Sequence, residues 1–127
     1  QRRGVLMTIL EVSFREMEGD KSAERTIREK VRKLVEAFPR IRICRITLEG
    51  RQRRQRSGKR YRIRIVMALP EREFVVAGES KGSEACEPLT RVLADTFSRA
   101  RRVLREHTKR LREEIEMASD RRATRWP

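Results

Sequence analysis

The sequence contains few of the residues on which most catalytic and metal sites depend. Among its 127 residues are two cysteines, Cys44 and Cys86, and one histidine, His107. This number and spacing fit no zinc motif, so we expect two buried or half-buried thiols in a reducing compartment. We expect no metal ion and no cofactor.

Catalytic motifs are equally scarce. No phosphate-binding GxxxxGK loop occurs, and no serine stands in the context of a nucleophile elbow. His107 falls on the apolar face of a predicted helix, which indicates an interface residue rather than a general base. Glu71 and Glu73 lie in a turn and form only a pair of carboxylates. The sequence therefore predicts a binding protein with no small-molecule substrate, not an enzyme.

Aromatic residues and long apolar runs are also rare. Aromatics make up 5% of the chain, so we expect one modest core built mainly from isoleucine, valine and leucine. No apolar run approaches the roughly 18 residues that a membrane-spanning helix needs. The start, Gln1 to Gly4, lacks the apolar segment of a secretory signal. We therefore expect a cytoplasmic protein without a membrane partner.

What the chain has in excess is positive charge. It carries 33 Lys and Arg against 19 Asp and Glu, which gives a net charge of +14. Charge of this size repels itself and lowers stability, so it indicates a polyanionic partner such as nucleic acid. Most of these cations are arginine, whose planar guanidinium can bind a phosphate through two parallel hydrogen bonds.

The sequence predicts one long helix at residues 85–117, around which the rest of the chain is organised. Its apolar residues recur every three or four positions, which places them on one face. They are Leu89, Leu93, Phe97, Ala100, Leu104, His107, Leu111 and Ile115. A basic arc lies beside this face and contains Arg91, Arg101, Arg102, Arg105, Lys109 and Arg112. We expect residues 119–127 to form a basic, flexible tail.

Four strands and one more helix are predicted before the long helix. The expected elements are a strand at 5–14, a helix at 23–38 with Ser22 as its N-cap, and strands at 41–48, 61–69 and 74–77. A strand-helix-strand start favours a right-handed crossover with parallel strands, and the hairpins that follow are antiparallel. The predicted fold of residues 1–118 is a single α+β domain with the order β-α-β-β-β-α. Its two helices pack on one face of a four-stranded mixed sheet.

Two further basic segments accompany the long helix. Residues 51–62 contain seven Lys and Arg and no acid, and Ser57-Gly58 marks the turn of a long hairpin. On the first helix, Arg25, Arg28 and Arg32 follow one flank at helical spacing. Surfaces of this kind follow a phosphate backbone. Base stacking is disfavoured because Tyr61, the one candidate aromatic, points toward the core, so recognition of RNA shape and phosphates is predicted.

Several local strings resemble the ribosome hibernation promoting factors, also called ribosomal subunit interface or sigma-54 modulation proteins. These strings are VSFREME, IREKVRKLVEAFPRI, RITLEG with GKRYRIRIVMALP, FVVAGES and LREHTKRLREE. The resemblance runs from about Leu6 to Ile115. The sequence departs from the family at the start of the last helix, residues 85–89. The second, dimerising domain of long members does not occur in these 127 residues, so we expect a short-form role.

The resemblance implies a β-α-β-β-β-α fold similar to double-stranded-RNA-binding domains. It also implies binding to the small ribosomal subunit, through its rRNA, near the decoding region. Translation would then be blocked because the protein occupies the mRNA and tRNA sites, without any bond being made or broken. The charge pattern and the resemblance together select the candidate RNA-binding residues. These are Arg25, Arg28, Arg32, Arg53, Arg54, Arg56, Lys59, Arg60, Arg91, Arg102, Arg105, Lys109 and Arg112.

Two other hypotheses stay open at this stage. The first is a general binder of double-stranded RNA or DNA, which would bind a naked duplex as tightly as it binds ribosomal subunits. The second is a structural protein that oligomerises through an exposed strand edge or helix, although the sequence itself gives no indication of a homo-oligomer.

Overall fold

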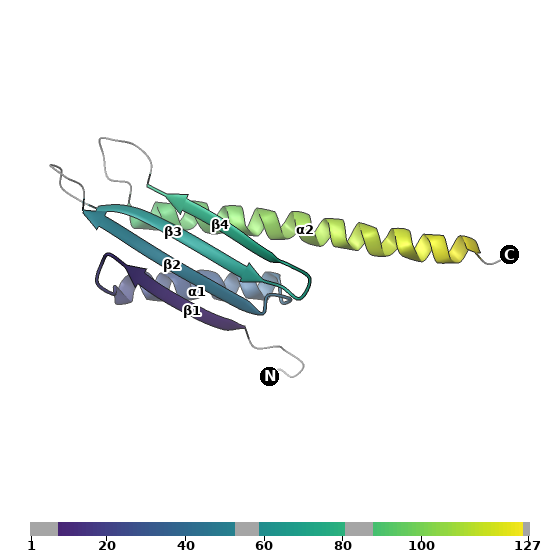
Figure 1. Cartoon of the computed structure of the whole chain (residues 1–127), viewed down its shortest axis with the longest axis horizontal. Coiled ribbons are helices and arrows are strands. Elements are labelled where there is room, and N and C mark those ends of the chain that lie inside the picture. Colours follow the sequence, from purple (N-terminus) through teal and green to yellow (C-terminus); the bar gives the residue numbers. More distant parts are fainter. Residues whose placement is uncertain (1–7, 53–58, 81–87, 126–127) are drawn as a thin grey trace.

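The chain folds as a four-stranded sheet with two helices on one side (Figure 1). The computed structural model describes residues 8–52, 59–80 and 88–125. In chain order the elements are β1 (Ile9–Arg15), α1 (Lys21–Ala37), β2 (Ile43–Gln52), β3 (Lys59–Ala68), β4 (Glu73–Glu79) and α2 (Leu89–Arg125). The predicted β-α-β-β-β-α order is therefore confirmed.

The strands lie in the sheet in the order in which they occur in the chain. β1 pairs with β2 in parallel, with Ile9 opposite Ile43, and the other two pairings are antiparallel. This is the mixed sheet that the sequence predicted. α1 makes the crossover between the two parallel strands, as such a connection requires.

Both helices pack against the same face of the sheet. Alternate residues of β2 and β3 point toward them and are fully buried, among them Ile46, Leu48, Ile63 and Ile65. α1 contributes Ala23, Ile27, Val31 and Leu34, and α2 contributes Val92, Leu93, Phe97, Ala100 and Leu104. The core is thus aliphatic, as the low aromatic content predicted.

The predicted thiols and membrane character can be checked only within the described residues. Cys44 is buried against this core, which raises the pKa of its thiol to about 12 and leaves it protonated. Cys86 lies outside the described residues. None of the described helices combines the length and the apolar character that crossing a membrane requires.

Several element ends differ from the sequence prediction: β2 extends to Gln52, beyond the predicted end at 48, and α2 begins at Leu89 rather than at residue 85. Two further differences have a clear local cause. The N-cap of α1 is Asp20 rather than Ser22, because the Asp20 carboxylate accepts hydrogen bonds from the backbone N–H groups of Ser22 and Ala23. α2 continues through the first part of the segment predicted as a tail, as far as Arg125. No glycine or proline interrupts the chain there, so no residue forces the helix to end earlier.

Glu71, in the turn between β3 and β4, joins three parts of the fold. Arg40, which follows α1, donates a hydrogen bond to one of its carboxylate oxygens. His107 of α2 places Nε2 2.7 Å from the other oxygen and packs edge-on against Phe74. The hydrogen bond from Arg40 is the largest cause, and that to His107 the next, of a Glu71 pKa lowered to about 2. His107 therefore serves as a structural contact, as predicted.

Close packing between β4 and α2 depends on Gly78. A Cβ atom at this position would overlap the hydroxyl group of Thr96 and lie 2.7 Å from the guanidinium of Arg99. Thr96 is fully buried, and its hydroxyl donates to the carbonyl of Val92 at 2.8 Å, so it cannot move aside freely.

We predict that Gly78→Ala lowers the free energy of unfolding by about 1–3 kcal/mol, as overpacking in a dense core does. Urea denaturation followed by circular dichroism measures this loss. Gly19→Ala is the matched control, because a Cβ there would meet only Phe14 at 3.9 Å, an ordinary contact. Equal stability of the two variants would contradict the close approach at Gly78.

We also predict that Glu71→Gln lowers the free energy of unfolding by about 1 kcal/mol at pH 7. The pKa of Glu71 lies below its ordinary value of 4.5 in the folded state. Its charge therefore stabilises the fold fully above about pH 4.5 and loses this contribution as the pH falls toward 2.

The measurement is denaturation of both proteins at pH 7 and near pH 2, where the difference between them should largely vanish. Glu73→Gln, at an exposed neighbouring position without an ion pair among the described residues, is the control. A pH-independent difference would mean that the carboxylate charge contributes nothing.

Candidate nucleic-acid interface

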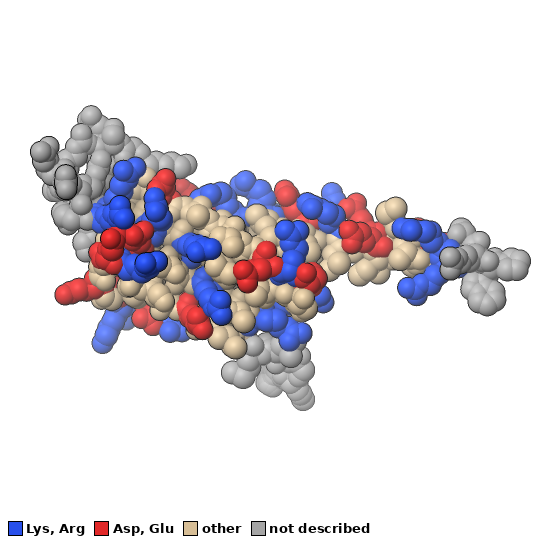
Figure 2. All heavy atoms as spheres, in the orientation of Figure 1, with Lys and Arg blue, Asp and Glu red and all other residues tan. Residues whose placement is uncertain are grey.

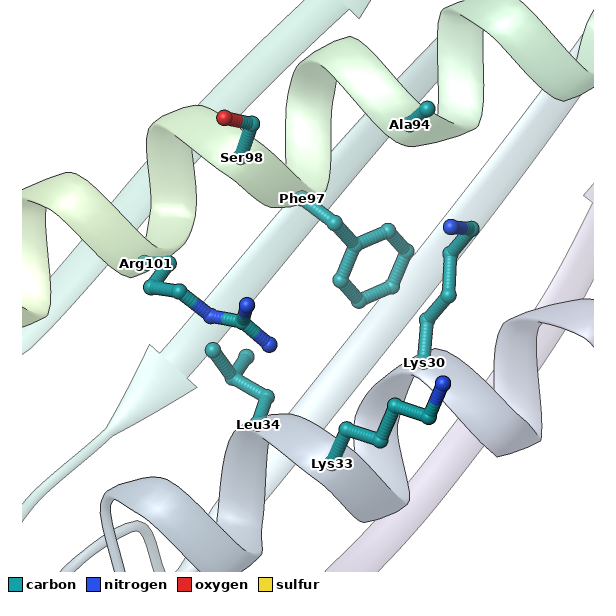
Figure 3. Close-up of a pocket in the computed structure, with 7 residues that line it drawn as sticks. All are labelled: Lys30, Lys33, Leu34, Ala94, Phe97, Ser98 and Arg101. Atoms are coloured by element: carbon teal, nitrogen blue, oxygen red, sulfur yellow. The ribbon is translucent and has the colours of Figure 1, made fainter.

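A basic groove runs between α1 and α2 on the side of the molecule that faces away from the sheet (Figure 3). We call this hollow of about 240 Å³ the interhelical groove. Its lining residues are Lys30, Lys33 and Leu34 from α1 and Ala94, Phe97, Ser98 and Arg101 from α2.

Helical spacing explains why these side chains meet. Leu34 and Phe97 are buried by the packing of both helices, at 1% and 7% exposure, and form an apolar floor. Lys30 and Lys33 precede Leu34 by four residues and one residue, so they lie on the flank of α1 that faces α2. Arg101 lies one turn after Phe97 and extends across the groove toward Leu34 (Figure 3).

The three cations of the groove form no ion pair among the described residues, although Glu29 attracts Lys33 along α1. Within the described parts of the chain, Lys30, Lys33 and Arg101 have no acidic group within ion-pair distance. Three positive charges over an apolar floor repel one another and concentrate a positive potential. The groove is therefore suited to bind an anion such as a phosphate group.

The basic surface continues along α2 beyond the groove. Arg105 and Arg112 follow Arg101 by four and eleven residues, which places them on the same flank of the helix. Both are exposed, and no acid occurs from Thr96 to Arg105. The predicted residues Arg91, Arg102 and Lys109 are also exposed, on the adjoining side of α2 that faces solvent. The predicted α2 residues thus extend the positive surface of the groove.

The predicted residues of α1 lie on its other flank. Arg28 and Arg32 border a separate hollow between α1 and β1, which also contains Leu10 and Val35. Arg28 forms an ion pair with Glu24 at 2.9 Å. Arg32 pairs with both Glu29 and Glu36, and its pKa is raised as a result. Arg25 is exposed. The structure does not bring these three arginines into the interhelical groove.

The basic hairpin is described only at its base. Arg53, Arg54 and Arg56 lie outside the described residues, and Lys59 is placed by its backbone, opposite Gln52. Arg60 is exposed and, by the alternation of β3, lies on the open face of the sheet, away from the helices. The described part of the hairpin is therefore not joined to the groove.

The open face of the sheet differs from the helix face in its charge pairing. Arg45 pairs with Glu11 at 3.1 Å, Arg51 with Glu16 at 2.8 Å, and Arg62 with Glu79 at 3.5 Å. Figure 2 shows basic and acidic side chains intermixed on this side. Three of its arginines are thus paired with glutamates, whereas Arg15, Arg60 and Arg64 of the same face have no ion pair among the described residues.

Sequence reasoning missed Lys30 and Lys33 and left Arg101 out of the selected set. The periodicity of α1 shows that Lys30 and Lys33 flank the apolar stripe, but Arg25, Arg28 and Arg32 flank it equally on the other side. Only the position of α2 decides which flank lines a groove. Among the described residues, no three of His, Cys, Asp and Glu come together in a way that could hold a metal ion.

Comparisons with known proteins support this fold and identify the family. A ribosomal subunit interface protein from Coxiella burnetii aligns with a TM-score of 0.64 at 8% identity, and the N-terminal domain of Thermus thermophilus Protein Y with a TM-score of 0.60 at 16%. Each alignment covers 80% of this chain and 99% of the other. Among curated proteins, the comparison found no match.

The family model described as sigma 54 modulation protein / S30EA ribosomal protein matches residues 10–112. These residues span every described element from Leu10 to Arg112, including the whole interhelical groove. The members are ribosome-associated hibernation and subunit-interface factors and not enzymes, which agrees with the prediction of a binding protein. This chain belongs to the sigma 54 modulation protein / S30EA ribosomal protein family.

Proposed function

We propose that this protein is a cytoplasmic translation inhibitor that binds the small ribosomal subunit near the decoding region. It blocks the mRNA and tRNA sites by occupying them. Family membership supports an association with the ribosome. The observation that carries the proposal is the interhelical groove, where Lys30, Lys33 and Arg101 lie together and form no ion pair among the described residues.

The groove and the adjoining flank of α2 would bind the phosphate backbone of rRNA. Lys30, Lys33 and Arg101 hold a phosphate over the apolar floor, and Arg105 and Arg112 follow the backbone along α2. Arg91, Arg102 and Lys109 add positive charge beside this track. Arg25, Arg28 and Arg32 form an outer edge, where RNA phosphates compete with glutamates for the arginines. Exposed ion pairs of this kind are weak, so the exchange costs little.

Recognition would depend on RNA shape rather than on base identity. None of the described aromatic residues is exposed, so the described surface has no platform on which a base could stack. Lysine and arginine contacts to phosphates position a protein without reading sequence. Specificity for one ribosomal location then requires a fixed spatial pattern of phosphates, which folded rRNA offers and a regular duplex does not.

Charge reversal in the groove tests the proposed function. Lys33→Glu combined with Arg101→Glu should weaken binding to purified small subunits about a hundredfold, because each reversal replaces an attraction to phosphate with a repulsion. Co-sedimentation at fixed salt measures this. The control is Arg15→Glu with Arg64→Glu, which makes the same change in net charge at exposed residues on the open face.

The control should lose less than about threefold in affinity. Equal losses in the two double variants would show that only net charge matters. Full displacement of the unmodified protein by a plain RNA duplex would instead support the alternative of a general duplex binder.

The salt dependence of binding tests whether the groove contacts phosphates. Replacing Lys33 and Arg101 with glutamine should reduce the magnitude of the slope of log K against log salt concentration by about 1.5 to 2. The reason is that the variant makes two fewer phosphate contacts, so its binding releases fewer counterions. Filter binding over a salt series gives the slope. An unchanged slope would mean that neither side chain contacts a phosphate, whatever the loss of affinity.

A further inference from the structure

The last part of α2 projects beyond the rest of the protein (Figure 1). A helix of 37 residues is about 55 Å long, whereas the strands beneath it have ten residues at most and span about 33 Å. His107 makes the contacts to Glu71 and Phe74 at the end of the sheet. About five turns of helix follow this point.

The apolar stripe of α2 continues along this projecting part. Leu104 is fully buried on the sheet, Leu111 is half-buried, and Ile115 is 63% exposed. Ala118 follows at the same helical spacing, so these residues share one face. An isolated helix of this length is only marginally stable in water. A partner on the apolar stripe would stabilise the segment.

The family match does not account for this segment. It ends at residue 112, whereas α2 continues to Arg125. The segment also differs in charge from the groove, because Glu113, Glu114 and Glu116 follow Arg112 directly. Three acids repel phosphates, so this part of α2 is not suited to extend the RNA-binding surface.

Charge at the edge of the stripe points to a particular partner. Arg110 and Glu114 are four residues apart and lie on the same flank of the stripe. Within the described residues they form no ion pair with each other or with another group. A basic residue before an acidic one is also the weaker order for such a pair within one helix. Both charges are therefore available to a second helix.

We propose that two copies of this protein associate through antiparallel contact of their projecting α2 segments. In an antiparallel pair centred at Arg112, Arg110 of each copy lies opposite Glu114 of the other. One ion pair thus occurs twice by two-fold symmetry, as in an isologous interface. Leu111 of each copy packs between these ion pairs and Ile115 packs just outside them, so that the exposed stripe is covered.

The contact would be small. α2 lies against its own sheet as far as His107. A partner helix lying side by side with α2 would run its residues 117–125 into that sheet, so the two helices cross near Arg112 and diverge from there. The overlap of two short helices buries less than a standard protein interface, so the dimer forms at high protein concentration. Each dimer presents two basic grooves and binds an RNA that reaches both with avidity.

Sedimentation equilibrium of the full chain at about 150 mM salt, where repulsion between the copies is screened, tests this proposal. The unmodified protein should dimerise, and Glu114→Arg should raise the dimer dissociation constant about tenfold, because each lost ion pair becomes a repulsion. Glu113→Arg is the matched control: it changes the charge equally at the adjacent residue, on the opposite side of the helix from the stripe. It should leave the constant nearly unchanged.

The double variant Arg110→Glu with Glu114→Arg exchanges the two charges and should restore dimerisation. Circular dichroism of each variant establishes that the helix still forms. A monomer up to about 1 mM protein would overturn the proposal, since even weak interfaces associate there. Equal effects of Glu114→Arg and Glu113→Arg, or a double variant that stays dissociated, would overturn the antiparallel pairing as well.

Discussion

The structure depends on the burial of two amphipathic helices on a single face of one small sheet. Burial of their apolar stripes places α1 and α2 side by side, and Leu34 and Phe97 form the floor between them. Because the sheet has no second covered face, the flanks of the two helices must come close together. Lys30, Lys33 and Arg101 therefore share one groove although they are distant in sequence. The hydrophobic effect positions these cations, and no polar contact among described residues is needed to do so.

The positive charges of the open face and of the groove differ in how they are paired with acids, and this difference indicates where an anion binds. On the open face, arginines of neighbouring strands alternate with glutamates, which is a stable arrangement across paired strands. In the groove the cations have no such partners among the described residues. A protein with a net charge of +14 thus has an open face on which several arginines are paired with glutamates, and a groove whose three cations lack an ion pair among the described residues and are suited to an anion from elsewhere. For a member of a ribosome-associated family, rRNA phosphates supply that anion.

The sequence predicted the element order, the mixed sheet and the core because these follow from local periodicity. The alternation of apolar and polar residues from Tyr61 to Leu69 was sufficient to predict β3, and the apolar stripe at helical spacing was sufficient to predict α1. The candidate site was predicted less completely. Lys30 and Arg28 lie on opposite flanks of one stripe, and only tertiary packing decides which flank faces α2. Competing local hydrogen bonds made Asp20, and not Ser22, the N-cap. The end of α2 was missed because helices can continue beyond the residues that the core buries.

Photo-cross-linking from the groove tests the central account most directly. A benzophenone side chain placed at Ser98, which lines the groove, should cross-link to the RNA of bound small subunits. The same side chain at Ser13, exposed on the open face, should give little or no RNA product. Cross-links to RNA from position 13 and none from position 98 would contradict the account, because the open face of the sheet would then be the one in contact with the ribosome.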